Sequence, residues 1–312
     1  LVGRLPSSLG RLSALRVLSM GNNKICGNIP PSLASLKTLQ RIVLHQNCLQ
    51  GRIPRELERT GCIVNVAGNP LLEMGPDVPQ AERAALVNLW EATQGYQWGN
   101  DAGWCSDDPV SSWYKVGTLG SHVHSLVMSS NRMRGELPAS MSALTQLRMI
   151  ELATMPRLQG PLPEALCRIV GLRRLCICRC GLSGPIPPGI GNLVALEELQ
   201  LFGNNFSGAI PPEIGQLANL KLLSLGEYTG GADFDAAPFP HFLTILVGLE
   251  ALFLSNCNIT GEIPDLSCLT ALRQLDLQNN LLEGPVPRSI SALSQLQYLN
   301  LKDNAGLSGQ LP

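Results

Sequence analysis

The sequence predicts an α/β repeat solenoid, in which short parallel strands stack along one face of a curved chain. A glycine followed two residues later by an aliphatic-proline pair recurs every 24 residues at Gly3, Gly27 and Gly51 and returns further along the chain. An L-x-x-L-x-L-x-x-N segment precedes most of these glycines. All four tryptophans fall between residues 70 and 120, where the repeat decays. We therefore expect two tandem arrays separated by an internal cap.

The repeated segment predicts a strand followed by a turn, as in Leu196, Leu199, Leu201 and Asn204. Alternation of its fourth and sixth positions is typical of a short strand with one buried face. The asparagine, turned inward, can bond backbone groups that the turn leaves unpaired. A single repeat cannot bury its apolar face, whereas a stack can.

The full pattern, L-x-x-L-x-L-x-x-N-x-L-x-G-x-I-P, resembles the plant-specific class of leucine-rich repeats. The resemblance implies a right-handed horseshoe with a parallel concave sheet. Other residues replace the asparagine at Met155, Cys180, Tyr228 and Cys257. Because methionine cannot donate a hydrogen bond, we expect irregular backbone at Met155, and we expect the same at Tyr228.

A helix is predicted in the tryptophan-rich stretch, from Gln80 after Pro79 to Thr93, ending before Gly95. Its apolar face comprises Ala85, Leu86, Leu89 and Trp90. The helix and the tryptophans that follow it resemble the N-terminal cap of plant-type leucine-rich-repeat receptors, and such caps shield the core of the first repeat.

The resemblance to these caps is incomplete. Family caps usually carry two cysteines around a W-x-G-V segment, where this chain has Ser111 and Thr118, with Lys115 in place of the glycine. Only Cys105 is nearby. The usual cap disulfide is therefore not carried over to this chain.

We expect three regions: the end of a first array at 1–72, the cap at 73–120, and a second array of eight repeats at 121–312. A break or hinge is expected near residues 70–80. Both ends of the sequence fall inside a repeat, so we expect a piece of a longer protein.

The charge balance argues against polyanionic partners. Only 15% of the 312 residues are charged and the formal net charge is −1, so we expect no binding to nucleic acid or to an anionic membrane surface. The longest apolar run, Phe242–Leu254, is too short and too interrupted to span a bilayer. We therefore expect no membrane contact.

No catalytic, cofactor or metal site is expected. The four histidines are scattered, and no known catalytic motif is visible. Cys176, Cys178 and Cys180 alternate along one predicted strand, so the first two should face the concave side. Neighbours two apart on a strand are badly placed for a disulfide. We expect ordinary small residues there.

Ligand binding is expected on the concave face of the second array. Phe206 and Phe239 occupy aliphatic positions of the repeat and are predicted in the core. Phe202 and Phe253 are instead predicted at outward strand positions, where they could anchor a partner or pack on each other over Ser224. The other candidate concave residues are Glu151, Arg174, Arg179, Glu198, Gln200, Glu227, Gln274, Asp276, Tyr298 and Lys302. Mixed charges and aromatics suit a peptide or protein ligand.

Two further features bear on function. An insertion at residues 229–237 contains Asp233, Phe234 and Asp235, which could contact a ligand, although many insertions are tolerated decoration. Sequons at Asn205 and Asn258 would be glycosylated in a secretory compartment.

We therefore expect a non-catalytic module that recognises a protein or peptide, by resemblance the extracellular, ligand-binding part of a receptor-like or surface protein. An intracellular scaffold or inhibitor subunit is the alternative, because the cap disulfide is missing and many cysteines are unpaired. A third alternative is the recognition half of a kinase or hydrolase whose catalytic domain lies outside this sequence.

Overall fold

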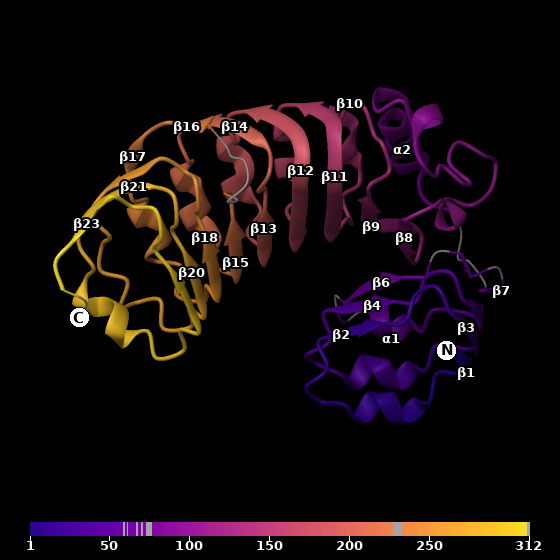
Figure 1. Cartoon of the computed structure of the whole chain (residues 1–312). Helices are drawn as coiled ribbons and strands as arrows, with labels where there is room; N and C mark the ends of the chain where they lie inside the picture. Colours follow the sequence, from indigo (N-terminus) through magenta and orange to yellow (C-terminus); the bar gives the residue numbers. More distant parts are fainter. Residues whose placement is uncertain are drawn as a thin grey trace.

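The protein is an arched solenoid built from two stacks of parallel strands (Figure 1). The structure is a computed structural model that describes residues 1–310 except 59, 61, 67, 70, 73–76 and 227–232. In the described part, the expected parallel sheets and repeated turns are confirmed.

The first array has two small parallel sheets joined by short helical turns. Its concave sheet consists of β2 (Val17–Ser19), β4 (Arg41–Val43) and β6 (Ile63–Asn65). The second sheet consists of β1 (Val2–Arg4), β3 (Lys24–Gly27), β5 (Cys48–Gly51) and β7 (Leu71–Leu72). The helical turns are η1 (Ser7–Arg11), η2 (Pro31–Ser35) and α1 (Arg55–Glu58).

The second array carries one long concave sheet that the cap's β-hairpin begins. The hairpin pairs β8 (Val116–Leu119) antiparallel with β9 (His122–Ser129). The parallel strands that follow are β11 (Met149–Gly160), β12 (Arg174–Gly184), β13 (Glu198–Gln200), β15 (Leu222–Ser224), β18 (Ala251–Phe253), β20 (Gln274–Asp276) and β22 (Tyr298–Asn300).

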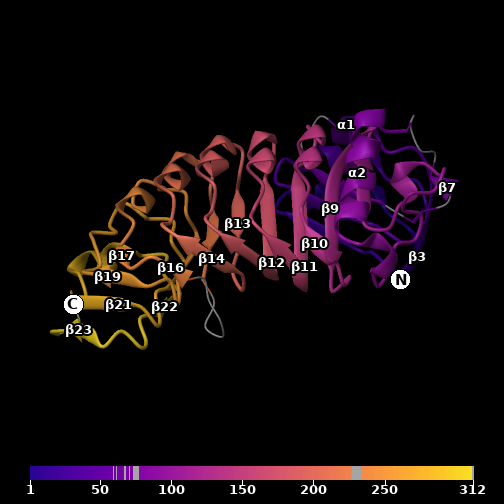
Figure 2. The ribbon, with the colours of Figure 1, turned by 90° about the horizontal axis from the view of Figure 1, so that it is seen from above.

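Behind most of the concave strands the chain forms a second short strand, a 3₁₀ turn or both (Figure 2). The second strands are β10 (Gly135–Glu136), β14 (Asn205–Gly208), β16 (Asp233–Phe234), β17 (Ala237–Pro238), β19 (Ile259–Gly261), β21 (Leu281–Pro285) and β23 (Gly306–Ser308). The turns are η5 (Ala139–Ala143), η6 (Glu164–Arg168), η7 (Pro188–Asn192), η8 (Pro212–Gln216), η9 (His241–Leu243) and η10 (Arg288–Ala292).

The repeated proline explains where the 3₁₀ turns start. Pro187 and Pro211 stand directly before η7 and η8 with φ of −68° and −67°. Their rings fix φ near this value and they need no hydrogen-bond partner for a backbone N–H. Because this position is repeated, each turn begins at the same point of its repeat.

The inward asparagines hold neighbouring repeats together, as expected. The Asn280 amide donates to the carbonyls of Leu254 and Leu277 at 2.8 and 2.9 Å, while its oxygen accepts the N–H groups of Cys257 and Ile259, both at 3.0 Å. Asn204 and Asn304 donate similarly to carbonyls of their own repeat and of the preceding one. These bonds satisfy buried backbone groups that the turn leaves unpaired.

The irregularity expected at Met155 is confirmed. The pairing of β11 with β12 shifts between Met155 and Gln159, in a turn that is one residue longer, from Met155 to Gly160, than the one from Cys180 to Gly184. Met155 is fully buried and packs in the core instead of bonding the backbone. The corresponding expectation for Tyr228 lies outside the described residues.

The cap helix is confirmed as α2 (Gln80–Ala92), and Ala85, Leu86 and Leu89 are buried. Short turns follow at η3 (Gly95–Gln97) and η4 (Val110–Ser112). Lys115, which replaces the glycine of the related caps, adopts a left-handed φ of 63°. Side chains other than glycine and asparagine rarely adopt this conformation, so the backbone shape of the cap persists without the glycine.

The cap is held by aromatic packing where related caps have a disulfide. All ten cysteines are free, Cys105 included. The ring of Trp104 lies 4.8 Å from that of Trp98 and 5.3 Å from that of Trp113. The Arg83 guanidinium stacks 5.0 Å above Trp113 and also binds Asp77 at 2.6 Å. This cluster joins the helix to the loops that follow it.

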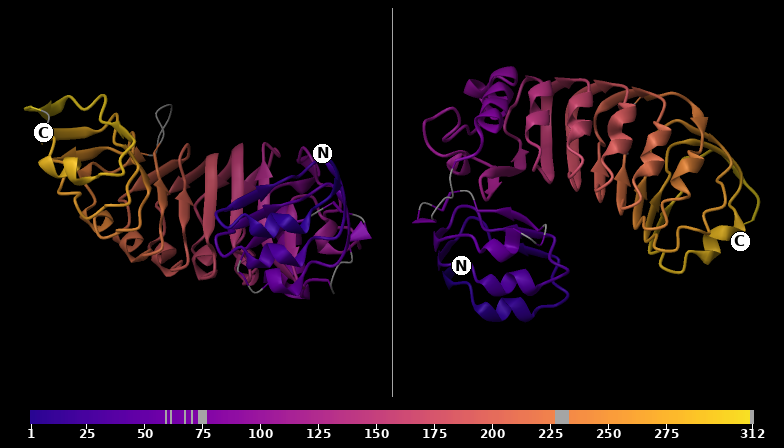
Figure 3. Two further views of the ribbon diagram at one scale, coloured as in Figure 1. Left: turned by 90° about the horizontal axis from the view of Figure 1, so that it is seen from below. Right: turned by 180° about the vertical axis from the view of Figure 1, so that it is seen from behind.

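Two separate apolar cores underlie the two arrays. In Figure 1 and in the right-hand view of Figure 3 the first array lies below α2 and the start of the long sheet, while the C-terminal repeats curve down on the other side. Strand β8 touches both cores, because Val116 is buried in the core of the second array and Leu119 packs against that of the first. The expected hinge near residues 70–80 falls partly on residues outside the described part and stays a prediction.

Candidate ligand-binding surface

The strand register places the outward residues of the second array in two rows. One row runs through Arg174, Glu198, Leu222, Ala251, Gln274 and Tyr298. The second row runs through Glu151, Cys176, Gln200, Ser224, Phe253, Asp276 and Asn300. Seven of the candidate residues therefore lie in these rows on the strands from β12 to β22: Arg174, Glu198, Gln200, Phe253, Gln274, Asp276 and Tyr298.

The middle of the surface is a shallow apolar floor. Leu222 and Phe253 are half-buried, whereas the small side chains of Ser224 and Ala251 are buried between them. Because these residues come from the neighbouring strands β15 and β18, they lie side by side. We name these four residues the apolar floor.

Phe202 lies beside the floor and does not continue its row. Gln200 pairs with Ser224 and Phe253 through the register, so Phe202 is two residues further along the chain. The Arg179 guanidinium stacks 5.5 Å from the Phe202 ring. The alternative that Phe202 and Phe253 pack on each other finds no support, because no contact between these two rings occurs among the described residues.

Charged residues flank the floor on the cap side. Arg174 forms an ion pair with Glu198 across β12 and β13, with 3.0 Å between Nε and Oε2. The same Glu198 oxygen accepts a hydrogen bond from the Gln200 amide at 3.2 Å. These three side chains are therefore held in place before any ligand arrives.

Glu151 faces the first array. Its Oε2 lies 3.4 Å from Nη2 of Arg41, which projects from β4. The first array folds back far enough to pair with this carboxylate, and a role of Glu151 in ligand binding stays a prediction. Sequence reasoning missed Arg41, since nothing along the chain relates it to a residue of the other array.

A polar cluster flanks the floor on the C-terminal side. Asp276 is buried and accepts hydrogen bonds from Tyr298 Oη at 3.3 Å, Asn300 Nδ2 at 3.2 Å and the Gln278 N–H at 3.0 Å. Asp276 thus positions the exposed Tyr298 ring and is not itself a free contact. Gln274 is exposed beside it.

Strand β12 brings two thiols close together, those of Cys176 and Cys178. The sulfur atoms of Cys176 and Cys178 are 3.2 Å apart and both residues are buried. The hydrogen bond between the thiols lowers the pKa of Cys176, and this bond together with burial raises the pKa of Cys178. Both cysteines are free, as expected. Within the described residues, no cluster of histidine, cysteine or carboxylate side chains could hold a metal ion.

The insertion contributes less surface than expected. Phe234 is only 2% exposed and packs in the core, so the expectation that it contacts a ligand is wrong; a short strand in this segment turns its ring inward. Asp233 and Asp235 are exposed. Glu227 lies outside the described residues, as does the first part of the insertion.

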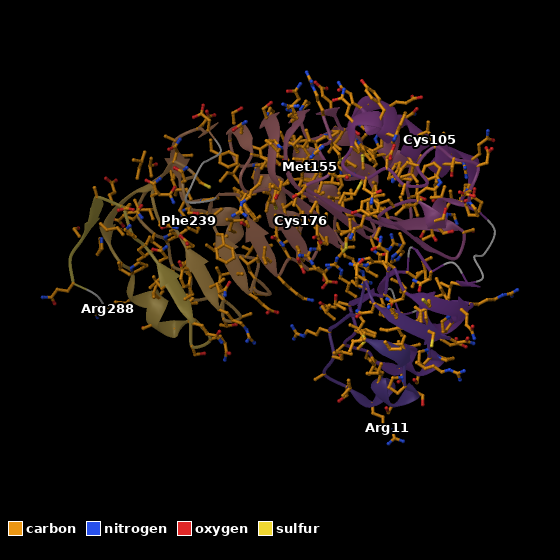
Figure 4. The ribbon with its side chains drawn as sticks, turned by 45° about the vertical axis from the view of Figure 1, so that its right-hand side comes forward. Arg11, Cys105, Met155, Cys176, Phe239 and Arg288 are labelled. Carbon is orange, nitrogen blue, oxygen red and sulfur yellow. The ribbon has the colours of Figure 1, made fainter. Side chains whose placement is uncertain are left out.

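The cap contains a buried carboxylate that sequence reasoning missed. Glu82, near the start of α2, is 2% exposed. Its two oxygens lie 2.6 Å from His122 Nδ1 and 2.7 Å from the Val123 N–H, so it ties the helix to the start of the long sheet. Figure 4 labels Cys105 in the cap and Met155 and Cys176 on the long sheet.

The aromatic residues that the sequence assigned to the core are buried as expected: Phe206 is 0% and Phe239 2% exposed. None of the helices in the described part is both long and apolar enough to cross a lipid bilayer.

Comparisons with known proteins agree with this architecture. A family described as the leucine-rich repeat region matches residues 122–311, and a single leucine-rich repeat matches residues 14–36. Protein BRASSINOSTEROID INSENSITIVE 1 of Arabidopsis thaliana is 44% identical over 64 residues, which are 20% of this chain and 5% of that protein. Receptor-like protein 35 of the same plant is 49% identical over 63 residues, 20% of this chain and 7% of that protein.

Solved structures extend the likeness over the length of the chain. The Arabidopsis receptor kinase HAESA, in complex with the peptide hormone IDA and the co-receptor SERK1, matches with a TM-score of 0.56 and 26% identity over 97% of this chain and 44% of that one. The plant peptide hormone receptor RGFR1, in complex with RGF2, matches with a TM-score of 0.54 and 26% identity. This match covers 100% of this chain and 47% of that one. The chain therefore spans less than half of these solved chains. With a family match over residues 122–311 and the repeat geometry described above, this chain belongs to the leucine-rich-repeat proteins.

Proposed function

We propose that this chain is a non-catalytic recognition module that binds a peptide or protein on the concave face of its second array, as part of a plant receptor-like protein. The observation that carries the proposal is the apolar floor flanked on both sides by prearranged polar groups. Such a surface gives a ligand apolar area to bury in the centre and hydrogen bonds at the rim.

The related proteins support this reading of the surface. The solved structures of HAESA and RGFR1 are complexes with a peptide hormone and with RGF2, respectively. Receptor-like protein 35 is 49% identical to this chain, although the match extends over only 63 residues. This chain spans only a fraction of the length of each relative. That the protein to which it belongs acts as a receptor with a peptide or protein ligand is therefore part of our proposal.

We place this recognition module outside the cell, because the related solved structures include the ectodomain of a plant membrane receptor kinase. The division into a first array at 1–72, a cap at 73–120 and a second array at 121–312 is part of the same proposal. Two separate cores, with α2 at the start of the second one, support it.

The binding proposal is tested with peptides selected from a displayed random library against the full chain. Phe202→Ala combined with Phe253→Ala should weaken binding of the selected peptides by about tenfold or more, because hot-spot aromatics typically contribute that much. The measurement is titration calorimetry or fluorescence anisotropy with each purified peptide.

The matched control combines Val194→Ala with Ile245→Ala, since these apolar side chains are 55% and 65% exposed in the outer turns of the same two repeats. The control should leave affinity unchanged. Equal affinities for the wild type and the Phe202/Phe253 variant would remove the concave face of the second array from the proposal.

The extracellular location is tested by glycosylation in plant cells. Asn205 is exposed, whereas the Asn258 amide donates to the Phe234 carbonyl at 2.9 Å and is half-buried. We expect a glycan on Asn205 and a lower occupancy on Asn258, measured as mass shifts in Asn205→Gln and Asn258→Gln variants. Protein from its native source that carries no glycan at either site would contradict the location.

A further inference from the structure

Two adjoining cavities lie at the carboxyl ends of the concave strands nearest the cap. The larger is about 540 Å³ and its polar lining comes from Gln97, Ser130, Arg132, Arg134, Thr154 and Arg157. The smaller is about 260 Å³ and is lined by Arg134, Arg157 and Gln159. Because Arg134 and Arg157 line both, the cavities form one site, which we name the arginine pocket.

The repeat itself stacks two of these arginines. Arg132 and Arg157 are 25 residues apart, the same interval that separates Gly135 from Gly160. The turn that carries Arg157 is one residue longer from Met155 to its glycine, Gly160, than the next turn is from Cys180 to Gly184, and the register of β11 against β12 shifts there. This longer turn forms one wall of the pocket.

The pocket has an excess of positive charge. Arg132, Arg134 and Arg157 are exposed, and none of them forms an ion pair within the part of the chain that the structure describes. Among the described residues, no aspartate or glutamate lines either cavity. Since the formal net charge of the whole chain is −1, this cationic site is a local feature.

Guanidinium groups point to the chemistry of the ligand. Each offers a planar fork of N–H donors that fits the two oxygens of a carboxylate, and such charge-assisted pairs are stronger than neutral hydrogen bonds. Gln97, Gln159, Ser130 and Thr154 add neutral hydrogen-bonding groups around the arginines. None of the lining residues that the structure describes is aromatic, so these residues offer no flat surface on which a sugar ring would stack.

We propose that the arginine pocket binds the carboxylate side chains of an acidic peptide segment. Two adjoining cavities that share their arginines give room for more than one carboxylate, which a single small anion would not fill. The proposal rests on the proposed function in one respect, namely that the ligand is a peptide, and it assigns an acidic stretch of that ligand to the cap end of the second array.

The test measures binding of fluorescein-labelled hexaglutamate to the full chain by fluorescence anisotropy. Salt is kept near 0.15 M, where the Debye length of about 8 Å suppresses effects of distant charges. The variant Arg132→Gln/Arg134→Gln/Arg157→Gln should bind about tenfold more weakly or worse, because hydrogen bonds to charged groups are the strong ones.

The matched control is Arg11→Gln/Arg168→Gln/Arg288→Gln, which removes the same charge from exposed arginines of outer turns. Both variants must melt within a few degrees of the wild type. The control should keep wild-type affinity. Equal weakening by both triple variants would overturn the proposal, since the effect would then follow net charge.

Two competitors test the class of ligand. The competitors are inorganic phosphate and a hexamer of an acidic sugar. The assignment to a peptide would be overturned if either displaced labelled hexaglutamate more effectively than unlabelled hexaglutamate does. The Phe202→Ala/Phe253→Ala variant should keep its affinity for hexaglutamate, because the apolar floor lies on other strands. Failure of the concave-face proposal is thus distinguished from failure of the arginine pocket.

Discussion

The repeats nearest the cap and the repeats further along the second array solve the same problem differently. In the distal repeats, from β13 to β22, Asn204, Asn280 and Asn304 bond the backbone of two successive turns. In the cap-side repeats, β11 and β12, Met155 and Cys180 occupy the same place in the turn. Asparagine is not universal in the distal part, where Cys257 takes its place, but the register shift and the arginine pocket both lie in the cap-side repeats.

The difference shows what the asparagine contributes. A buried amide can donate two hydrogen bonds and accept two, so it satisfies four backbone groups at once. The Cys180 thiol reaches only the carbonyls of Leu152 and Cys178, at 3.8 and 3.4 Å, and a thiol is a weak donor. The register shifts at Met155, where the amide is missing and the turn also has one extra residue before Gly160, and this turn borders the arginine pocket.

The largest expected effect is on a distal turn. Asn280→Ala should lower the free energy of unfolding by about 4 kcal/mol, because it leaves two buried carbonyls and two buried N–H groups without a partner. Urea denaturation followed by circular dichroism measures this loss. Cys180→Ala removes only weak bonds and serves as the reference. If Asn280→Ala lowered the free energy of unfolding no more than Cys180→Ala does, the contrast between amide and thiol turns would be wrong.

Acid should destabilise the cap-side repeats more than the distal ones. Burial, together with the charges of Arg148 and Arg173, lowers the pKa of His124 on β9 from 6.5 to about 3. The unfolded chain therefore binds the extra proton between these values, so stability is full above pH 6.5 and falls as the pH decreases. We expect a loss of about 2 kcal/mol between pH 6.5 and 5.

His124→Gln serves as the control for this loss, since carboxylates also titrate at lower pH. Hydrogen exchange at pH 6.5 and 5 locates the change along the chain. The variant should lose most of the pH dependence of β9 and β11. A wild type whose cap-side amides exchange with the same free energy at both pH values would contradict the assignment.

A smaller effect, a gain in stability, is expected when the asparagine of the distal turns is introduced into a cap-side turn. Cys180→Asn should raise the free energy of unfolding by about 1 kcal/mol, since an amide can bond the carbonyls that the thiol reaches weakly. The melting temperature is the measurement, with Cys180→Ser as the control of smaller size. A decrease would mean that β12 has no room for an amide at this turn.

The smallest effect is expected at Met155, whose side chain only packs in the core. Met155→Leu conserves volume and should change stability by less than about 1 kcal/mol. The thermal unfolding curve measures it. Hexaglutamate binding should also be unchanged, which separates the fold of the bulge from the chemistry of the three arginines.

Much of the difference between the cap-side and distal repeats could be predicted from the sequence. The repeat period predicted the strands, the turns, the core positions of Phe206 and Phe239, and the irregular backbone at Met155. The site was harder. Phe234 was expected at the surface and is buried, because an insertion has no period from which the direction of a side chain can be read. Arg132 and Arg157 carried a readable signal in their spacing of one repeat, which sequence reasoning missed.

The sequence by itself determined the solenoid, because a repeated pattern of apolar residues, asparagine, glycine and proline gives every repeat the same local structure and the same neighbours. Only the tertiary structure decided how the two arrays meet. The ion pair of Arg41 with Glu151, the anchoring of the cap through Glu82 and the joining of two cavities into one arginine pocket all depend on chain segments that lack a common period. Their contacts follow from the path of the backbone in space, and that path depends on packing between repeats.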